Sequence, residues 1–447
     1  MNKKVMFISL GCDKNLVDSE QMLGMLSGGG YTFTDDEKEA DAVVINSCCF
    51  INDAKEESIR TILEMAELRK SGSVEALIVT GCLAERYREE IQKEIGEVDA
   101  VIGTAAIDEV VKTLDDVFQG TKENHYQSLD RKPLTGVHRV MTTGGHYAYL
   151  KIAEGCDKHC TYCIIPRVRG PYRSVPMESL LEEAKELAAG GVKELILVAQ
   201  ETTLYGVDLY GRKALPELLR KLCEIDGLYW IRLLYCYPEE IDEELIRTIK
   251  EEKKICHYLD LPVQHASDSV LKRMGRRTDR NDLTRIVKHL REEIPDICLR
   301  TTLITGFPGE TEEDHEIMMD FVEEMAFDRL GVFLYSQEED TPAAVMEHQI
   351  SEPVKERRYG ELMELQQEIA FDAAMDMKGR VVTAMVEGRV ADENACVART
   401  YKDAPNVDGF LFINTDRDLM TGDFVQVRIM GSYEYDLIGE LEDEFTE

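Results

Sequence analysis

The sequence lacks any hydrophobic segment that suits a membrane and shows no sign of an export signal. Its 447 residues contain no run of about 18 uncharged apolar residues, so no membrane span is expected. The N-terminal stretch MNKKVMFISLGCDKN has two lysines and a short apolar run, but no small-residue cleavage site follows. We interpret it as a first strand rather than a signal peptide, and we expect a cytoplasmic protein.

Positive charge is also scarce. The chain has 52 Lys and Arg residues against 87 Asp and Glu residues, which gives a formal net charge of −35. A surface this acidic repels phosphate backbones, which proteins usually bind through lysine and arginine. It would attract a basic partner, although solubility alone explains such a charge equally well. We expect no membrane contact and no strong direct binding of nucleic acid.

Cysteine is abundant, with twelve in the chain. A reducing cytoplasm disfavours disulfides, so clustered cysteines indicate metal ligation or catalysis. Scattered cysteines in apolar surroundings pack as small hydrophobic residues. We expect five to be plain core thiols: Cys223, Cys236, Cys256, Cys298 and Cys396.

Three strand-length apolar runs near the N-terminus each end in a cysteine. VMFISLGC ends at Cys12, DAVVINSC at Cys48 and EALIVTGC at Cys82, and helical patterns separate them. Alternating strands and helices predict a parallel sheet, whose strand ends lie together at the ligand-binding edge. The three thiols are therefore within reach of a common metal. The alternative is that the three thiols are buried by coincidence, which their repeated position after a strand disfavours. Cys49, next to Cys48, is not expected to be one of the three ligands.

Changes of pattern divide the chain into five segments. Residues 1–118 predict an α/β domain with a doubly wound parallel sheet, and 119–145 lose periodicity like a linker. Residues 146–351 alternate six candidate strands with helical patterns, which predicts an open or partial (β/α)6 barrel with its site at the carboxyl ends of the strands. A charged helical stretch, 352–376, connects to 377–447, whose short β runs predict a small β-barrel.

The stretch EGCDKHCTYCIIP places Cys156, Cys160 and Cys163 on one compact loop. Four thiolates normally hold a four-iron cluster, so three leave one iron open for a substrate or cofactor. An open position marks a reactive site rather than a structural one. Structural zinc is the alternative, but it needs a fourth ligand, and His159 beside Cys160 would point elsewhere.

Other motifs are less specific. Arg167, Arg169 and Arg173 follow the cysteine loop and are expected to pair with surface acids; the alternative is that they neutralise a carboxylate substrate or the cofactor. His265 is expected to be a satisfied histidine inside the barrel. TGFPGET, residues 305–311, lacks the Gly-Lys-Ser/Thr ending of a phosphate loop and is interpreted as a turn at the barrel edge.

The Cys-x3-Cys-x2-Cys loop, with Tyr162 before its last cysteine, resembles the radical S-adenosylmethionine enzymes. In that superfamily the amino and carboxylate groups of S-adenosylmethionine chelate the open iron. Electron transfer then yields a 5′-deoxyadenosyl radical that abstracts hydrogen. The resemblance implies a 4Fe-4S cluster, S-adenosylmethionine and an electron donor. Gln200 and Glu201, at the end of a barrel strand, either contact the ribose or methionine part of the cofactor or cap a helix.

Over essentially the whole chain, the layout resembles the methylthiotransferases of that superfamily. The resemblance implies that Cys12, Cys48 and Cys82 ligate a second 4Fe-4S cluster, whose open iron carries the sulfur to be inserted, and that 377–447 form a TRAM domain. LGCDKNLVDSE and GCDKHCTYCIIPRVRGPYRS resemble the RimO-type subgroup. That subgroup converts an aspartate β-carbon C–H of a small-subunit ribosomal protein to C–S–CH3.

Two other functions compete with this one. A tRNA methylthiotransferase would use the same chemistry, but its terminal barrel must grip phosphates. Residues 377–447 hold 15 acidic and 7 basic side chains, which suits a basic ribosomal protein instead. A non-catalytic iron–sulfur carrier is disfavoured by the open coordination positions.

Overall fold

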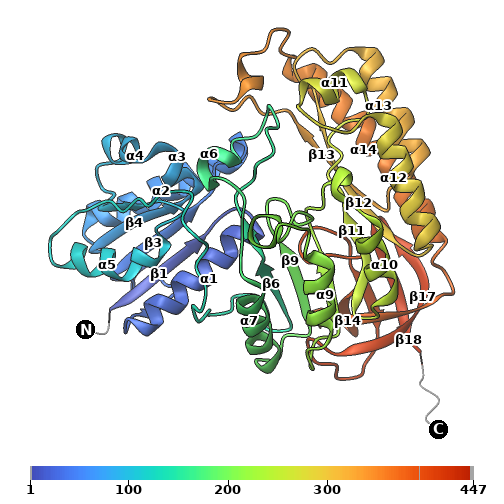
Figure 1. Cartoon of the computed structure of the whole chain (residues 1–447). Helices are drawn as coiled ribbons and strands as arrows, with labels where there is room; N and C mark the ends of the chain where they lie inside the picture. Colours follow the sequence, from blue (N-terminus) through green and yellow to red (C-terminus); the bar gives the residue numbers. More distant parts are fainter. Residues whose placement is uncertain (1–2, 392, 443–447) are drawn as a thin grey trace.

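The structure is a computed structural model that describes residues 3–391 and 393–442. Figure 1 shows three successive regions: an N-terminal α/β unit in blue, a central half-barrel in green and yellow, and a terminal β-barrel in red. No helix in the described part of the chain is long and apolar enough to cross a bilayer.

The N-terminal unit is built on a parallel sheet in the order β2-β1-β3-β4-β5. This confirms the predicted doubly wound sheet. The short edge strand β2 was not predicted, because its two residues are exposed and carry no apolar run. The order reverses between β1 and β3, which is where open sheets of this kind bind ligands. The strands are β1 (Lys4–Ser9), β2 (Thr32–Phe33), β3 (Ala42–Ser47), β4 (Ala76–Gly81) and β5 (Ala100–Ile102).

Helices cover both faces of this sheet. Side chains of α1 (Asp13–Gly28) and α5 (Val110–Phe118) pack on one face. Those of α2 (Asn52–Ser71), α3 (Cys82–Tyr87) and α4 (Glu89–Glu94) pack on the other. Because both faces are covered, every residue of β3 and β4 is buried, which explains their unbroken apolar sequences.

The central region is a six-stranded parallel sheet in chain order, from β6 at one edge to β13 at the other. The sheet does not close on itself, so the predicted partial barrel is confirmed. Its strands are β6 (Tyr147–Lys151), β9 (Glu194–Val198), β10 (Trp230–Leu233), β11 (Ile255–Asp260), β12 (Cys298–Thr305) and β13 (Arg329–Leu334). A two-stranded ribbon joins β7 (Ala153–Glu154) to β8 (Arg173–Ser174).

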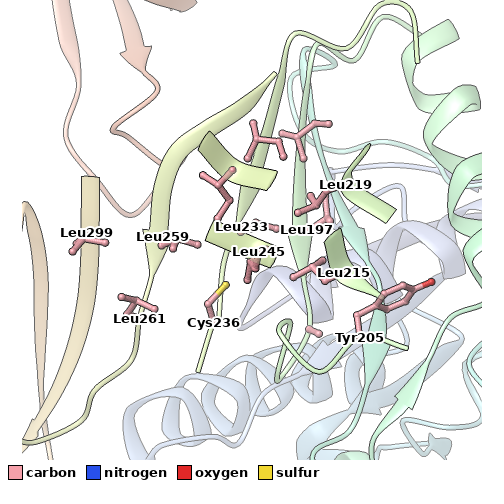
Figure 2. Close-up of a cluster of buried hydrophobic side chains, with 14 of the residues drawn as sticks. Leu197, Tyr205, Leu215, Leu219, Leu233, Cys236, Leu245, Leu259, Leu261 and Leu299 are labelled. Carbon is pink, nitrogen blue, oxygen red and sulfur yellow. The ribbon is translucent and has the colours of Figure 1, made fainter. Parts of the chain in front are cut away.

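A layer of leucines joins these strands to the helices outside them. Leu197 of β9 and Leu233 of β10 face Leu215 and Leu219 of α9 (Figure 2), and all four are at most 1% exposed. Burial of each such side chain stabilises the fold by roughly 1.5–3 kcal/mol. The helices are α6 (Ile165–Arg169), α7 (Met177–Ala189), α8 (Val207–Tyr210), α9 (Leu215–Cys223), α10 (Glu243–Glu251), α11 (Asp268–Arg273), α12 (Arg280–Glu293) and α13 (Glu312–Met325).

The terminal region is a closed barrel in the order β14-β15-β16-β18-β17, reached through the helix α14 (Glu352–Met375). The predicted small barrel is confirmed. Closure pairs every strand and leaves no sheet edge exposed. The strands are β14 (Val381–Arg389), β15 (Ala395–Thr400), β16 (Leu411–Asn414), β17 (Phe424–Tyr433) and β18 (Asp436–Leu441).

A buried charge network joins the terminal barrel to the half-barrel. Arg399 of β15 and Arg232 of β10 both donate to Glu194 at 2.7 Å, and all three side chains are at most 1% exposed. Asp403 pairs with Arg329 beside them. Breaking a buried pair of this kind costs about 3–5 kcal/mol. The terminal barrel is therefore part of the central fold and not a separable appendage.

The segment 119–145 lies between the first two regions. Its described residues form neither helix nor strand, but His125 makes an isolated bridge to Ile102. Arg139 is buried and pairs with Glu20 of α1 and Glu183 of α7. The segment is thus tied to both neighbours. The expected core thiols are buried at Cys236, Cys256, Cys298 and Cys396 and partly buried at Cys223.

Two candidate cysteine sites

The three N-terminal cysteines lie at the carboxyl edge of the N-terminal sheet. Cys12 lies between β1 and α1, Cys48 follows β3 directly, and Cys82 follows β4 as the first residue of α3. The strands β1 and β3 flank the point where the strand order reverses. The structure therefore places these cysteines where the sequence predicted them, at the edge that binds ligands in such sheets.

Two glycines allow these strand ends to approach one another. Gly11 has φ +89°, and a Cβ on it would lie 2.6 Å from Cβ and 2.9 Å from Sγ of Cys48. Gly81 has φ +93°, and its Cβ would lie 2.3 Å from the carbonyl oxygen of Ser47. Any other residue would be strained and would push the loops apart. This explains the glycine before Cys12 and before Cys82.

The buried thiols of this site disfavour a free negative charge. Cys48 and Cys82 are buried, and Cys12 is exposed. Burial raises the pKa of Cys48 to about 12, and the nearby Cys82 and Cys12 raise it further. Burial also raises the pKa of Cys82, although Arg169 opposes that rise. Thiolates here need a compensating cation, which is what an iron–sulfur cluster would provide.

The distances between the sulfur atoms distinguish a site for an iron–sulfur cluster from a site for a single zinc ion. Zinc holds thiolates at about 2.3 Å in a tetrahedron, which places them roughly 3.8 Å apart. Within the part of the chain that the structure describes, neither cysteine trio has all its sulfur atoms within 4.8 Å of one another. Cysteines on different irons of one cluster are held farther apart than ligands of one ion. As placed here, neither trio has the close sulfur spacing of ligands to one zinc ion.

The second site is the loop from Cys156 to Cys163, between β7 and α6. Cys156 and Cys160 are 6% and 7% exposed. The backbone N–H of Lys158 donates to Sγ of Cys156 at 3.4 Å, and the N–H of Cys163 donates to the carbonyl of Cys160 at 3.1 Å. These bonds curl the loop so that its thiols converge. Burial raises the pKa of Cys156 to about 12 and that of Cys163 as well.

Gln200 holds the start of this loop. Its Oε1 accepts from the N–H of Gly155 at 2.9 Å, and its Nε2 donates to Glu154 at 2.9 Å. Both ends of the side-chain amide are therefore engaged by the protein. Gly155 itself requires φ +79°, and a Cβ there would lie 2.1 Å from the carbonyl oxygen of Pro171.

Glu201 offers a free oxygen instead. The residue is fully buried, and its Oε1 accepts from the N–H of Thr203 at 2.9 Å. Its Oε2 is buried with no hydrogen-bond partner among the described residues, and Nζ of Lys158 lies 3.9 Å away. Burial raises the pKa of Glu201 to about 7, against the opposing effects of Thr203 and Lys158. This carboxyl group can accept a cationic donor.

Further buried polar atoms without partners surround the loop. Arg276 is 7% exposed, and its Nε and Nη1 lack partners among the described residues. Its guanidinium lies 4.5 Å from the ring centroid of Tyr237, whose hydroxyl is 4.0 Å from Sγ of Cys160. Oε2 of Glu239 is also buried; it accepts no hydrogen bond among the described residues and lies 3.9 Å from Nη2 of Arg276. No sequence motif pointed to these three residues, because Arg276 lies on a different connection of the half-barrel from Tyr237 and Glu239.

The arginines after the loop differ from one another. Arg167 is 63% exposed and lies 3.5 Å from the equally exposed Asp340, as predicted. The prediction was wrong for Arg169, which is 2% exposed and pairs with the buried Asp18 at 2.6 Å. Its Nε also donates to Sγ of Cys82 at 3.3 Å. The cause is that Val168 of α6, together with Ile164 just before the helix, packs into the core of the N-terminal unit.

The two remaining motifs are structural. His265 is fully buried, and its Nδ1 accepts from the N–H of Ser267 at 3.0 Å, while Nε2 lies 3.6 Å from Glu310. Glu310 accepts from the N–H groups of Gly306 and Phe307 at 2.7 and 3.1 Å. The TGFPGET segment is thus a turn closed by its own glutamate at the end of β12.

Three known families match successive parts of the chain. Residues 4–103 match the Uncharacterized protein family UPF0004, residues 150–322 the Radical SAM superfamily, and residues 379–441 the TRAM domain. These ranges fall within the α/β unit, the half-barrel and the terminal barrel.

Among solved structures, the chain is similar to the radical S-adenosylmethionine methyltransferase TsrM from Kitasatospora setae. The TM-score is 0.57 at 14% identity, over 77% of this chain and 74% of that one. That structure holds cobalamin and a 4Fe-4S cluster. At this identity, the similarity shows a shared fold and nothing more.

Relatives with known names match along the whole chain. The chain is 62% identical over 439 residues to ribosomal protein uS12 methylthiotransferase RimO of Lachnoclostridium phytofermentans, covering 98% of this chain and 100% of that one. It is 50% identical to the protein of that name from Acetivibrio thermocellus, covering 99% of both. For Clostridioides difficile the identity is 47%, with 98% of both covered. The chain therefore belongs to the RimO family of radical S-adenosylmethionine methylthiotransferases.

Proposed function

We propose that this protein replaces a β-carbon C–H of an aspartate in ribosomal protein uS12 with C–S–CH3, using S-adenosylmethionine and two iron–sulfur clusters. The observation that carries the proposal is the presence of two separate three-cysteine sites in one chain, whose full-length relatives are named for this activity. Breaking a C–H bond and delivering sulfur are different tasks, and two sites suit them.

Each cysteine trio would hold one cluster. Cys156, Cys160 and Cys163 are assigned to the cluster that works with S-adenosylmethionine, and Cys12, Cys48 and Cys82 to the one that delivers sulfur. Three thiolates leave one iron of each cluster open for a small molecule. The raised thiol pKa values of Cys48 and Cys156 support this assignment, since iron would supply the charge that burial otherwise demands.

When bound, the first cluster and S-adenosylmethionine supply a carbon-centred radical that removes a hydrogen atom. The protein binds and orients the cofactor. Oε2 of Glu201, which accepts no hydrogen bond among the described residues, suits an N–H of the cofactor's amino group, and Nε and Nη1 of Arg276, which donate none, suit its carboxylate. Gln200 is better assigned to holding the loop, because both of its polar atoms are engaged.

The terminal barrel supports a basic protein as substrate. Two of its acids, Asp403 and Asp408, are buried against the half-barrel, but Asp416, Asp418 and Glu434 are exposed. A negative surface attracts a basic protein and repels RNA. A tRNA substrate is the second candidate, because the chemistry at the two cysteine sites would be the same.

The test is to incubate reconstituted, reduced enzyme with purified uS12, with small ribosomal subunits and with tRNA. Mass spectrometry should find the methylthio mass on an aspartate of uS12 and none on tRNA. If tRNA were modified and uS12 were not, the substrate would be tRNA, and the proposed radical chemistry would still hold. Formation of 5′-deoxyadenosine without any methylthio product would contradict the transferase.

A further inference from the structure

Arg169 follows the Cys156–Cys163 loop in the sequence, but its side chain contacts the N-terminal cysteine site. It ends α6, the helix that follows the Cys156–Cys163 loop. Its side chain is 2% exposed and donates from Nε to Sγ of Cys82 at 3.3 Å. Its Nη2 donates to Oδ1 of Asn15 on α1. One side chain thus joins the loop of the half-barrel to a thiol of the N-terminal sheet.

The surrounding charges hold this guanidinium in a fixed orientation. Nη1 lies 2.6 Å from Asp18 and 3.3 Å from Glu154, and Lys151 pairs with both carboxylates. The positive charges of Lys151 and Arg169 are therefore balanced by the two carboxylates. Nε is turned away from them and has sulfur as its partner. A planar guanidinium offers donors in several fixed directions, which a lysine cannot do.

Asn15 fixes the other side of the contact. Its Nδ2 donates at 3.0 Å to the carbonyls of Leu10 and Ser47, which belong to the segments carrying Cys12 and Cys48. Its Oδ1 accepts from Arg169 and lies 3.7 Å from Sγ of Cys82. Through Asn15, Arg169 is connected to all three segments of the N-terminal site.

We propose that Arg169 is a positioning residue that links the two cysteine sites and tunes the sulfur of Cys82. Its N–H orients that sulfur and draws electron density from it, which makes a cluster held there easier to reduce. The same side chain fixes how the radical loop lies on the N-terminal unit. The inference rests on the proposed function, because it takes Cys82 to be a cluster ligand.

The test isolates the N-terminal cluster in the full-length chain. Cys156, Cys160 and Cys163 are changed to Ala, and Arg169→Met is added to that background. Iron content, the electron paramagnetic resonance spectrum and the reduction potential are then measured. We expect about four irons in both proteins. The potential should become more negative and the spectrum should change with Arg169→Met. With Arg169→Lys the potential should move in the same direction as with Arg169→Met, but by a smaller amount.

Two further variants guard against trivial results. Arg167→Met removes an exposed cation from the same helix and should leave potential and spectrum unchanged. Arg169→Met with Asp18→Asn removes a buried cation and anion together, so it stays charge-balanced if the single variant unfolds. Circular dichroism checks folding. Loss of the N-terminal cluster from a folded Arg169→Met variant would overturn the tuning role, because about four irons are expected there.

The two hypotheses can fail separately. An unchanged potential and spectrum in both Arg169 variants would overturn the role of Arg169, whatever the enzyme modifies. Failure of the unmodified enzyme to act on uS12 would overturn the proposed function and leave the spectroscopic shift standing. In the otherwise unmodified enzyme, Arg169→Met should reduce the methylthio product more than it reduces the formation of 5′-deoxyadenosine.

Discussion

The two cysteine sites gather three thiols in different ways. Cys156, Cys160 and Cys163 share one loop, so the local backbone sets their separation. The N-terminal trio comes from three strands and meets only because parallel strands end at one edge. A local site depends on its own residues, whereas a distributed site depends on sheet register and on close approach between loops.

The register of the N-terminal sheet shows this dependence. Ser9 is aligned with Asn46, and Ser47 with Gly81, so that Cys48 and Cys82 directly follow aligned residues. A slip of one residue would turn each side chain to the opposite face of the sheet. The thiols therefore converge because the hydrophobic core of the sheet fixes its register.

The largest effect should come from removing each trio in turn. Two four-iron clusters imply about eight irons per chain, and each triple alanine variant should retain about four. Loss of Cys156, Cys160 and Cys163 should abolish formation of 5′-deoxyadenosine. Loss of Cys12, Cys48 and Cys82 should spare it and abolish methylthio transfer. Iron analysis and product chromatography decide; full iron content in either variant would disprove two separate clusters.

The next prediction concerns close approach. Gly11→Ala should remove most of the iron from the N-terminal site, because the new methyl group would overlap Cys48. The Cys156 site should keep its iron, and formation of 5′-deoxyadenosine should persist. Iron content and thermal unfolding are measured together.

Gly30→Ala is the matched control. Gly30 has φ +86°, close to the +89° of Gly11, but a Cβ on it would meet nothing within 4 Å. Both variants carry a similar backbone strain of about 1–2 kcal/mol, and only Gly11→Ala also carries the clash. Equal iron loss in the two variants would show that strain, not close approach, empties the site.

The contrast between the sites also explains what could be predicted from sequence. Thiols at fixed spacing in one loop are visible directly. The N-terminal trio was predicted because each cysteine ends an apolar run, and the ends of parallel strands lie together at one edge of the sheet. The three regions followed from changes of periodicity, since continuous apolar strands predict a sheet covered on both faces.

Contacts between regions could not be predicted in this way. Arg169 was assigned to the surface because nothing in its local sequence shows that α6 packs into the neighbouring unit. Arg276 and Tyr237 come from separate loops and carry no motif. Nothing in the sequence of residues 377–447 showed that Arg399 is buried against Glu194. Each depends on the docking of surfaces whose partners are far apart in sequence.

A smaller effect is expected at Glu201, which serves only the local site. Its carboxyl group has a pKa of about 7 because it is buried, so it is largely neutral below that pH and ionised above it. The ionised form accepts more strongly than the neutral form from an N–H of the amino group of S-adenosylmethionine. The dissociation constant should fall as pH rises from about 6 to 8, by about tenfold, or about 1.4 kcal/mol.

Glu201→Gln should bind S-adenosylmethionine about tenfold more weakly at pH 8 and lose that pH dependence. Equilibrium binding to the reconstituted protein measures both. Glu434→Gln serves as the comparison, since it removes an exposed carboxylate from the terminal barrel and leaves Glu201 in place. An unchanged pH profile in Glu201→Gln would exclude this carboxyl group as the partner of the cofactor's amino group.

The smallest effect should come from the surface that distinguishes the substrates. Deleting the terminal barrel is unsuitable, because Glu194 and Arg232 would lose the buried Arg399. Changing the exposed Asp416 and Glu434 to Lys leaves that network intact. Binding of uS12 should weaken several-fold at low salt, with both cysteine sites keeping their iron.

The difference between the native and reversed proteins should shrink as salt rises, because exposed charges are screened beyond about 8 Å at physiological ionic strength. A titration against uS12 and against tRNA at two salt concentrations tests this. Charge reversal should also raise non-specific affinity for tRNA, since added lysines meet phosphates. If the native protein already bound tRNA tightly and ignored uS12, the acidic barrel would not select the substrate. The second candidate function would then be preferred, while the comparison between the two cysteine sites would stand, because the ligand cysteines lie outside the terminal barrel.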